Sequence, residues 1–209
     1  MLFGAGGHAK VVADIVERAG GRVAAVLDDD ARRHGRMLMG YPVGGGSEAV
    51  PGLCASGAKF LVALGDNRTR LAVATRLAGA GASFGTAIHP AAVIGREVVV
   101  GEGSVVMAGT VVNPATRIGR HVIVNTGASI DHDCDIGDGV HVAPGCRVCG
   151  GVTVGAGTLL GVASAVLPGR RVGAGAVVGA GAVVTEDVPD GAVVAGSPAR
   201  PLRGNVHGD

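Results

Sequence analysis

Aliphatic residues recur every six positions through the second half of the chain. Starting at Ile88 and stepping by six reaches Val184, and all seventeen positions on this path carry Ile, Val or Leu. The fourth residue after each one, from Val100 onward, is Ser, Thr, Ala, Val or Cys, except at Arg170. Helices repeat every 3.6 residues and strands every two, so a strict period of six predicts short strands joined by equivalent corners, a parallel β-solenoid.

A period of eighteen residues is superimposed on the first. An aliphatic residue followed by glycine recurs at this spacing at Val100-Gly101, Ile118-Gly119, Ile136-Gly137, Val154-Gly155 and Val172-Gly173. Three strands per coil follow, and residues 88 to about 190 hold nearly six coils. Aliphatic side chains stacked at the strand spacing of about 4.8 Å fill a narrow interior in which aromatic rings do not fit.

The first 85 residues predict strands that alternate with helices. Residues 8 to 19 repeat apolar positions at helical spacing, and Arg22 to Leu27 form a short run rich in aliphatic residues. Lys59 to Leu64 predict a further strand, and Arg68 to about Leu77 a helix after a turn. Only three residues precede Gly4, where a strand of about five is usual, so we expect that the N-terminus of the sequence is trimmed or misassigned. Alternation of this kind indicates a small parallel sheet.

Composition marks the same boundary between two parts. The four aromatic residues, three Phe and one Tyr, lie within residues 1–84, and the remaining 125 residues have none. The chain contains 39 glycines in 209 residues, but 47% of its residues are apolar, which argues for burial and against disorder. We therefore expect an α/β domain over residues 1–85 and a solenoid domain over residues 86–209.

Charge and composition exclude several kinds of partner. The chain has 18 basic and 17 acidic residues, a net charge of +1, and so few aromatics that neither the basic patch nor the stacking platform of a nucleic-acid-binding protein is expected. Residues 148 to 169 carry no charge, but their six glycines argue against a membrane span. The chain begins without a secretory signal pattern, so a cytoplasmic location is expected. Cys146 and Cys149 form a CxxC pair without a second half, so the four cysteines predict reduced thiols and no metal site.

A glycine-rich turn opens the first predicted helix. Residues Gly4 to Ala9 satisfy G-x-G-x-x-A, and Asp28 and Asp29 follow about twenty residues later. Such glycines let backbone N–H groups approach a pyrophosphate at a helix N-terminus; a plain tight turn into a helix is the alternative. About 85 residues supply only half of a doubly wound dinucleotide fold, so a Rossmann-like βαβ unit for a nucleotide diphosphate fits better than one for NAD.

Candidate chemistry lies on the outward positions of the solenoid. By their places in the six-residue repeat, Cys134 and Cys146 point inward, whereas His132 and His141 point outward from different faces. His132 stands between two aspartates, the densest polar cluster of the repeat, and a carboxylate beside an imidazole raises its basicity and fixes its tautomer. Solvated surface is the alternative for this cluster. His89 and His121 lack such neighbours and are interpreted as structural.

The whole chain resembles a known family of sugar acyltransferases. The six-residue pattern resembles that of hexapeptide-repeat acyltransferases, whose coils form a left-handed β-helix. Three segments resemble the group of sialic-acid O-acetyltransferases and bacillosamine or perosamine N-acetyltransferases: GAGGHAK at residues 4–10, GDNRTR at 65–70 and NTGASIDHDCDIG at 125–137. The resemblance implies a homotrimer with acetyl-CoA as the cosubstrate.

The resemblance also implies which residues bind the nucleotide sugar. The glycine loop would hold the diphosphate, the two aspartates the base and ribose, and the second loop the rest of the nucleotide. These residues are Gly6, Gly7 and His8 for the diphosphate, Asp28 and Asp29 for the base and ribose, and Gly65 with Arg68 for the remainder.

For the acyl-transfer site the resemblance implies a histidine base. His132 would be the general base, Asp133 the partner that raises its basicity, and His141 a contact for the thioester carbonyl of acetyl-CoA. Val162 and Ala180 would meet the pantetheine arm through their backbone groups.

The expected function is direct N-acetylation of a 4-amino-deoxy sugar linked to UDP or GDP, in bacterial glycan biosynthesis. A sialic-acid-type O-acetyltransferase would use the same solenoid with a hydroxyl acceptor. A more distant alternative is a zinc carbonic-anhydrase-like solenoid, with His121, His132 and His141 as metal ligands. A non-catalytic module that binds nucleotide sugars gives no role to the histidine cluster.

Overall fold

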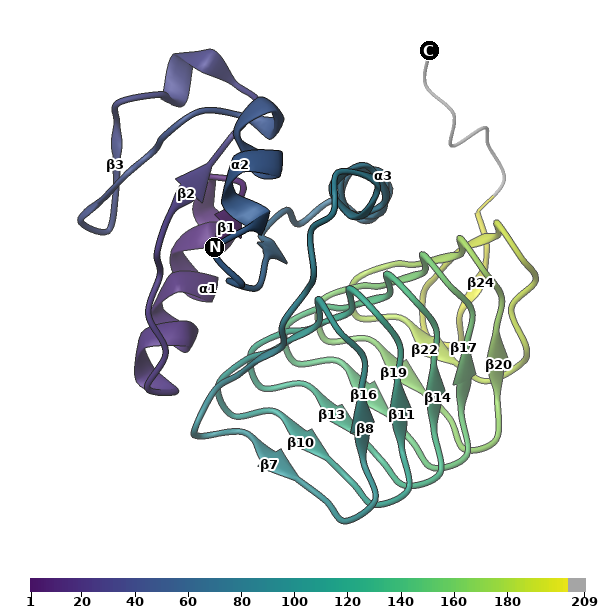
Figure 1. The fold of residues 1–209 in the computed structure, drawn as a ribbon. Helices are drawn as coiled ribbons and strands as arrows, with labels where there is room; N and C mark the ends of the chain where they lie inside the picture. Colours follow the sequence, from purple (N-terminus) through teal and green to yellow (C-terminus); the bar gives the residue numbers. More distant parts are fainter. Residues whose placement is uncertain (203–209) are drawn as a thin grey trace.

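Two differently built parts make up the described residues, 1–202, of this chain in the computed structural model (Figure 1). Residues before about 85 form a small α/β unit, and the rest winds into a β-solenoid whose coils stack along one axis. The predicted fold class is thereby confirmed. Residues 203–209 of the expected second domain lie outside the described residues.

The α/β unit is built on a three-stranded parallel sheet. Strand β1 (Leu2–Phe3) lies between β2 (Val26–Leu27) and β5 (Leu61–Val62). Helix α1 (Gly7–Arg18) follows β1, and α3 (Asn67–Gly79) follows β5, so both predicted helices form. Strands β2 and β5 are shorter than the apolar runs that predicted them, since only two residues of each pair with β1.

Short elements fill the segment between β2 and β5. A hairpin and two 3₁₀ turns occupy most of it, and none of them has a periodic sequence pattern. They are η1 (Ala31–Arg33), β3 (Met37–Leu38), β4 (Tyr41–Pro42), η2 (Ser47–Ala49) and helix α2 (Val50–Cys54).

The solenoid has three parallel sheets, one on each face of a triangular prism. The first face has eight strands, the second six and the third five. The first face contains β6 (Ala87–Ile88), β9 (Val105–Val106), β12 (Ile123–Val124), β15 (His141–Val142), β18 (Leu159–Leu160), β21 (Val177–Val178), β23 (Val193–Ala195) and the antiparallel β24 (Arg200–Pro201). The second face contains β7 (Val93–Ile94), β10 (Val111–Val112), β13 (Ser129–Ile130), β16 (Arg147–Val148), β19 (Ala165–Val166) and β22 (Val183–Val184). The third contains β8 (Val99–Val100), β11 (Arg117–Ile118), β14 (Asp135–Ile136), β17 (Thr153–Val154) and β20 (Arg171–Val172).

Each coil lies in register on the next at a spacing of eighteen residues. Val112 pairs with Ile130, and Ile130 with Val148, so equivalent aliphatic residues stack on one another. From Val106 onward these side chains form one continuous buried cluster inside the prism. At the open first coil the same position is partly exposed, as at Ile94.

The second inward position, four residues after each aliphatic one, holds small side chains from Val100 onward, except at Arg170. Most of the serines and threonines at this position donate their hydroxyl groups to backbone carbonyls. Thr116 and Thr158 donate to the carbonyls of Asp131 and Gly173 at 2.7 and 2.6 Å. Each is fully buried, so these bonds remove the cost of an unpaired polar group. Arg170, the exception in the pattern, is exposed.

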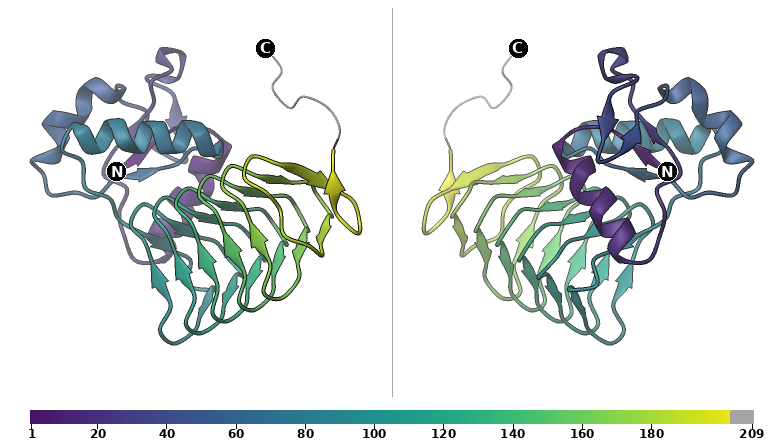
Figure 2. Two further views of the ribbon diagram at one scale, coloured as in Figure 1. Left: turned by 90° about the vertical axis from the view of Figure 1, so that its right-hand side faces the viewer. Right: turned by 90° about the vertical axis from the view of Figure 1, so that its left-hand side faces the viewer.

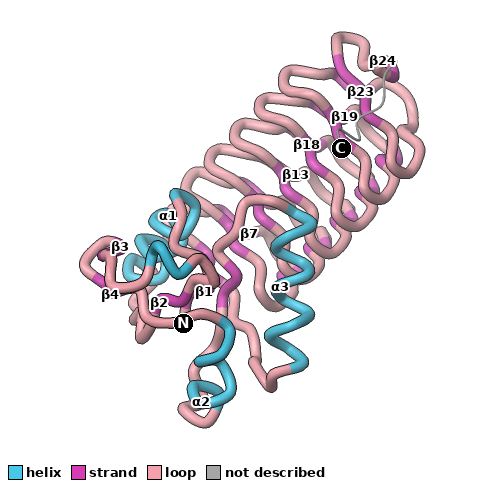
Figure 3. The backbone as a smooth tube through the Cα atoms, turned by 90° about the horizontal axis from the view of Figure 1, so that it is seen from above, coloured by secondary structure: helices cyan, strands magenta, loops and turns pink. Residues whose placement is uncertain are grey.

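The α/β unit packs on the first face of the solenoid, where α1 and α3 lie over its opening coils (Figures 2 and 3). Val12 and Ile15 of α1 share a core cluster with Val105, Met107 and Ile123 of the solenoid. The two parts therefore bury apolar surface against each other. No helix in the described range is long and apolar enough to span a bilayer.

Candidate functional site

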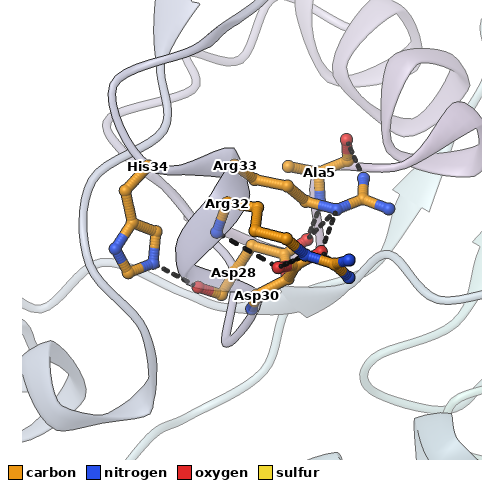
Figure 4. A network of polar contacts seen from close by, with 6 residues as sticks. All are labelled: Ala5, Asp28, Asp30, Arg32, Arg33 and His34. Carbon is orange, nitrogen blue, oxygen red and sulfur yellow. Dashed lines mark hydrogen bonds and ion pairs between the residues drawn. The ribbon is translucent and has the colours of Figure 1, made fainter.

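The glycine loop between β1 and α1 is fixed by Asp28. The Ala5 N–H donates to Asp28 Oδ2 at 2.7 Å, and Arg33 donates to the Ala5 carbonyl at 2.7 Å (Figure 4). Gly4 has a φ of 110°, and a Cβ there would lie 2.9 Å from the Ala63 carbonyl oxygen, so the turn requires glycine. A Cβ at Gly7 would meet no atom within 4 Å, which leaves the helix N-terminus open to a ligand.

Asp29 has other partners than the glycine loop, although the sequence groups it with Asp28. It accepts the Ser47 N–H at 2.8 Å and pairs with Arg76 of α3. Asp28 accepts the N–H groups of Ala5 and of residue 30. The two aspartates therefore lie in different surroundings, and only Asp28 contacts the glycine loop.

The loop before α3 reaches across to the solenoid. Asp66 caps α3 by accepting the Thr69 N–H at 2.8 Å. Asn67 donates to the carbonyls of Gly157 and Thr158 at 3.0 and 3.1 Å. This contact fixes the loop beside the first face.

A cavity of about 420 Å³ lies between this loop and the first face. It brings together Gly65 and Arg68 from the α/β unit with His141 from β15. Leu159 and Val177, on the next two strands, form its apolar wall. Two of the predicted nucleotide-binding residues and one predicted contact for acetyl-CoA therefore line one cavity.

Two histidines near Arg70, His8 and His141, are held in the neutral form. Burial, and then the positive charge of Arg70, lowers the pKa of His141 to about 4. Burial, Arg70 and His141 lower the pKa of His8 to about 4 in the same way. Asn125 Nδ2 donates to His141 Nε2 at 3.1 Å, which places the remaining ring proton on Nδ1. His8 Nε2 is buried and has no hydrogen-bond partner among the described residues.

Arg70 was not singled out by the sequence, yet it joins the two parts of the chain. Its side chain is 1% exposed, and no carboxylate bonds to it. Burial lowers the pKa of the guanidinium to about 10. Five oxygen acceptors surround the guanidinium. They are the carbonyls of Leu64 and Gly65 at 3.1 and 3.0 Å, Asn67 Oδ1 at 2.9 Å, and the solenoid carbonyls of His121 and Gly139, both at 2.8 Å.

His132 stands at the corner that leads from β13 on the second face to β14 on the third. Its Nδ1 lies 2.7 Å from Asp133 Oδ2, and its side chain is 60% exposed. The hydrogen bond to Asp133, followed by the charge of Asp131, raises the pKa of His132 above its ordinary value. Asp133 has a φ of 57°, the left-handed conformation that most corners of the solenoid give to glycine. The pair leaves Nε2 turned away from the carboxylate, as a general base requires.

A single chain does not bring His132 and His141 together. His132 lies at the corner after the second face, whereas His141 lies on the first. Val162 and Ala180 are both exposed and lie one above the other at the corner from the first face to the second. The Gly181 N–H donates to the Val162 carbonyl at 2.8 Å, which fixes this stack.

The remaining histidines are held by local contacts. His121 is buried, and its ring meets that of Phe84 edge to face at 4.6 Å between centroids. His89 Nδ1 accepts the Ala91 N–H at 2.9 Å. Within residues 1–202 no three His, Cys, Asp or Glu side chains gather in a way that could hold a metal ion.

The inward cysteines are poor nucleophiles. Cys134 and Cys146 are 2% and 0% exposed. Burial raises the pKa of the Cys146 thiol to about 11 and also raises the pKa of Cys134. Since the thiolate is the reactive form, neither residue is set up to carry an acyl group.

Comparison with known proteins assigns both parts of the chain to described families. The PglD N-terminal domain family matches residues 1–77, and the bacterial transferase hexapeptide family matches residues 115–150. A curated relative, the UDP-N-acetylbacillosamine N-acetyltransferase of Bacillus subtilis (strain 168), is 39% identical over 110 residues, 51% of this chain. That match spans about half of the relative, 50% of its length.

Solved structures match nearly the whole chain. PerB from Caulobacter crescentus, in complex with CoA and GDP-perosamine, is 42% identical, with 96% of this chain and 95% of that chain covered and a TM-score of 0.91. The acetyltransferase domain of PglB from Neisseria gonorrhoeae FA1090, in complex with acetyl coenzyme A, is 37% identical, with 96% and 97% covered and a TM-score of 0.90. Identity at this level over the full solenoid and α/β unit shows that the chain is an acyltransferase and belongs to the hexapeptide-repeat sugar acyltransferase family.

Proposed function

We propose that this chain is an acetyl-CoA-dependent N-acetyltransferase that acts on the amino group of a nucleotide-linked 4-amino-deoxy sugar. The observation that carries the proposal is the His132 Nδ1 to Asp133 Oδ2 contact of 2.7 Å, which leaves Nε2 free as a base. The relatives named above support the acceptor class, since one acts on a UDP-linked amino sugar and one was solved with GDP-perosamine.

Transfer is direct in this proposal. The sugar amine attacks the thioester carbonyl carbon of acetyl-CoA while His132 Nε2 removes its proton, and Asp133 stabilises the imidazolium that forms. The new C–N bond forms as the carbonyl becomes an oxyanion, which then collapses and expels CoA as a thiolate that takes up the proton. His141, Val162 and Ala180 would contact the thioester and pantetheine. No acyl-enzyme is needed, consistent with the raised thiol pKa of the buried Cys146.

The α/β unit supplies the nucleotide site in this proposal. Residues 1–85 would form the nucleotide-sugar-binding domain and residues 86–209 the acetyltransferase domain. Gly6, Gly7 and His8 would hold the diphosphate, and Asp28 and Asp29 the base and ribose. Gly65 and Arg68 would then hold the rest of the nucleotide, at the mouth of the 420 Å³ cavity that His141 also lines. The cytoplasmic location expected from the sequence stays a prediction.

A homotrimer completes the site in this proposal. His132 and the cavity lie at different corners of one prism, so one chain holds two halves that do not meet. A neighbouring copy that packs side by side with the first, with the two solenoid axes parallel, would bring its His132 near the His141 cavity of the first copy. Cyclic symmetry then gives three equivalent sites per trimer.

Replacing His132 tests the base. His132→Ala should lower kcat by about 10² to 10⁴ while the affinity for the nucleotide sugar persists, because the nucleotide-binding residues are untouched. Release of the CoA thiol measures turnover, and calorimetry measures binding. His89→Ala is the matched control, since the His89 side chain accepts only the N–H of Ala91 in its own corner. Near-normal turnover of His132→Ala would show that His132 is not the general base.

The acceptor is tested separately. UDP- and GDP-linked 4-amino-4,6-dideoxy sugars are compared with free sialic acid in the thiol-release assay. Acetylation of the amine identifies the proposed reaction, and acetylation of sialic acid alone identifies the O-acetyltransferase. Metal analysis of the active protein tests the zinc alternative.

A further inference from the structure

Glycine occupies one corner position at which the repeat otherwise carries a side chain. The position is the second residue after each aliphatic residue of the six-residue path, the place where His132 stands. From Pro90 to Glu186 the chain passes this position seventeen times, and only residue 150 is glycine. Gly150 follows His132 by eighteen residues, so it lies at the same corner one coil further on.

Gly150 packs directly against the imidazole of His132. A Cβ built on Gly150 would lie 2.7 Å from both Cε1 and Nε2 of His132, and 3.3 Å from Cδ2. Real Cβ atoms do not approach other heavy atoms so closely, so the ring would have to move. The ring edge that a Cβ would meet carries Nε2, the nitrogen that does not contact Asp133.

The coil on the other side holds the same corner by hydrogen bonds. Asn113 Nδ2 donates to Asp131 Oδ1 at 2.7 Å, and the same oxygen accepts the His132 N–H at 2.9 Å. Asp133 holds Nδ1 of the ring. Asn113 of the preceding coil therefore fixes the backbone at His132. In the following coil, Gly150 has no side chain to contact the His132 ring.

Neither coil stacking nor backbone conformation requires glycine at this position. Gly150 is not among the glycines with a positive φ. A Cβ at Gly155 would meet the backbone of the next coil, with Ala174 N at 2.3 Å, whereas the three nearest atoms to a Cβ at Gly150 all belong to the His132 ring. That ring is the exposed end of a side chain and can rotate away. Alanine at residue 150 is thus compatible with the fold but not with the observed place of the imidazole.

We propose that Gly150 is a positioning residue for His132: its missing side chain gives the imidazole its place and leaves Nε2 uncovered for the acceptor amine. This inference rests on the proposed function, in which Nε2 is the general base. It adds a residue one coil away from the Asp-His-Asp cluster to those that determine the geometry of the base.

Gly150→Ala tests the inference, with Gly79→Ala as the matched control. A Cβ at Gly79, the last residue of α3, would meet nothing within 4 Å, so the control adds the same methyl group to open space. Both variants should keep the wild-type melting temperature within about 2 °C, as surface substitutions do. Gly150→Ala should lower kcat by about 100-fold with little change in KM for the nucleotide sugar, because a base misplaced by about 1 Å costs that much.

A second measurement reads the ring without any substrate. NMR titration of labelled histidines in the free protein should show the pKa of His132 falling toward its ordinary value in Gly150→Ala, as the ring leaves Asp133. Wild-type kcat together with an unchanged His132 titration would overturn the inference. A melting temperature of Gly150→Ala well below that of the wild type would overturn it too, because the loss of activity would then come from a damaged fold. If the wild type acetylates no amino sugar, the proposed function fails, while the titration still decides the role of Gly150.

Discussion

Surroundings give the histidines of the site opposite proton affinities. Burial beside Arg70 lowers the pKa of His8 and His141 to about 4, so both rings are neutral near pH 7. His132 lies in solvent beside Asp133, and that hydrogen bond raises its pKa. Hence only His132 combines an accessible nitrogen with a raised proton affinity, the property of a general base near neutral pH.

Removing the carboxylate beside His132 should shift the pH dependence of catalysis. The base acts in its neutral form, so kcat/KM rises with pH through the pKa of His132. Asp133→Asn removes the interaction that raises this pKa, so the acid limb should move to lower pH while the plateau rate falls, because the neutral ring becomes a weaker base. Asp138→Asn, at a different corner and paired with Arg120, is the control. An acid limb that stays in place in Asp133→Asn would show that Asp133 does not tune His132.

The neutral histidines should make the protein sensitive to acid. Their folded-state pKa values of about 4 lie below the model-peptide value of 6.5, so between these limits the unfolded chain binds more protons than the native one. Stability should therefore be full above pH 6.5 and fall as the pH drops to about 4, by up to about 3 kcal/mol for each group. Urea unfolding from pH 7 to 4 measures this slope. It should be shallower in His141→Gln, and an equal slope would contradict the argument.

Among the elements, the corners of the solenoid set the tightest limits on sequence. A Cβ at Gly155 would lie 2.3 Å from Ala174 N and 2.6 Å from its Cα, both backbone atoms of the next coil. Gly155 is not among the glycines with positive φ, so only space requires glycine there. This close contact between coils explains why an aliphatic residue followed by glycine recurs every eighteen residues.

Gly155→Ala should therefore destabilise the fold by about 1–3 kcal/mol or more, because the stacked backbone cannot yield as a side chain can. The free energy of unfolding in urea measures the loss, with Gly79→Ala again as the control in open space. Equal stability of the two variants would mean that the coils can separate locally. Gly155 and Gly150 thus illustrate two different reasons for a corner glycine, space for a backbone and space for a side chain.

Periodicity predicted the solenoid almost completely, and the site only in part. Strand positions and inward residues followed from the six-residue repeat, because every coil repeats the same local contacts. The burial of His141 could not be predicted this way, since it depends on a loop 76 residues earlier in the chain, at Gly65. Arg70 was missed for the same reason: its acceptors at His121 and Gly139 lie 51 and 69 residues away. Contacts between the α/β unit and the solenoid do not recur along the chain, so no repeat in the sequence predicts them.

For the whole molecule, the buried Arg70 couples the two parts. Its guanidinium donates to the carbonyls of the loop before α3 and to carbonyls at two solenoid corners, so the loop cannot move away from the first face without breaking several buried hydrogen bonds. The cavity that Gly65, Arg68 and His141 share is therefore preformed by packing within one chain. His132, the proposed base, lies at a different corner of the prism from this cavity.

Mixing two inactive variants tests this division between chains. His132→Ala lacks the base and His141→Ala lacks the cavity histidine, so each alone should be nearly inactive. In trimers formed at random from equal amounts, a site is intact when one neighbour supplies His132 and the other His141, which gives about a quarter of wild-type activity for a cyclic trimer. Denaturing and refolding the variants together forms such trimers, and refolding them separately before mixing is the control. Recovery in the first sample and none in the second would place the base and the cavity on different subunits. If neither sample recovers activity, the proposal that neighbouring subunits share the site is wrong.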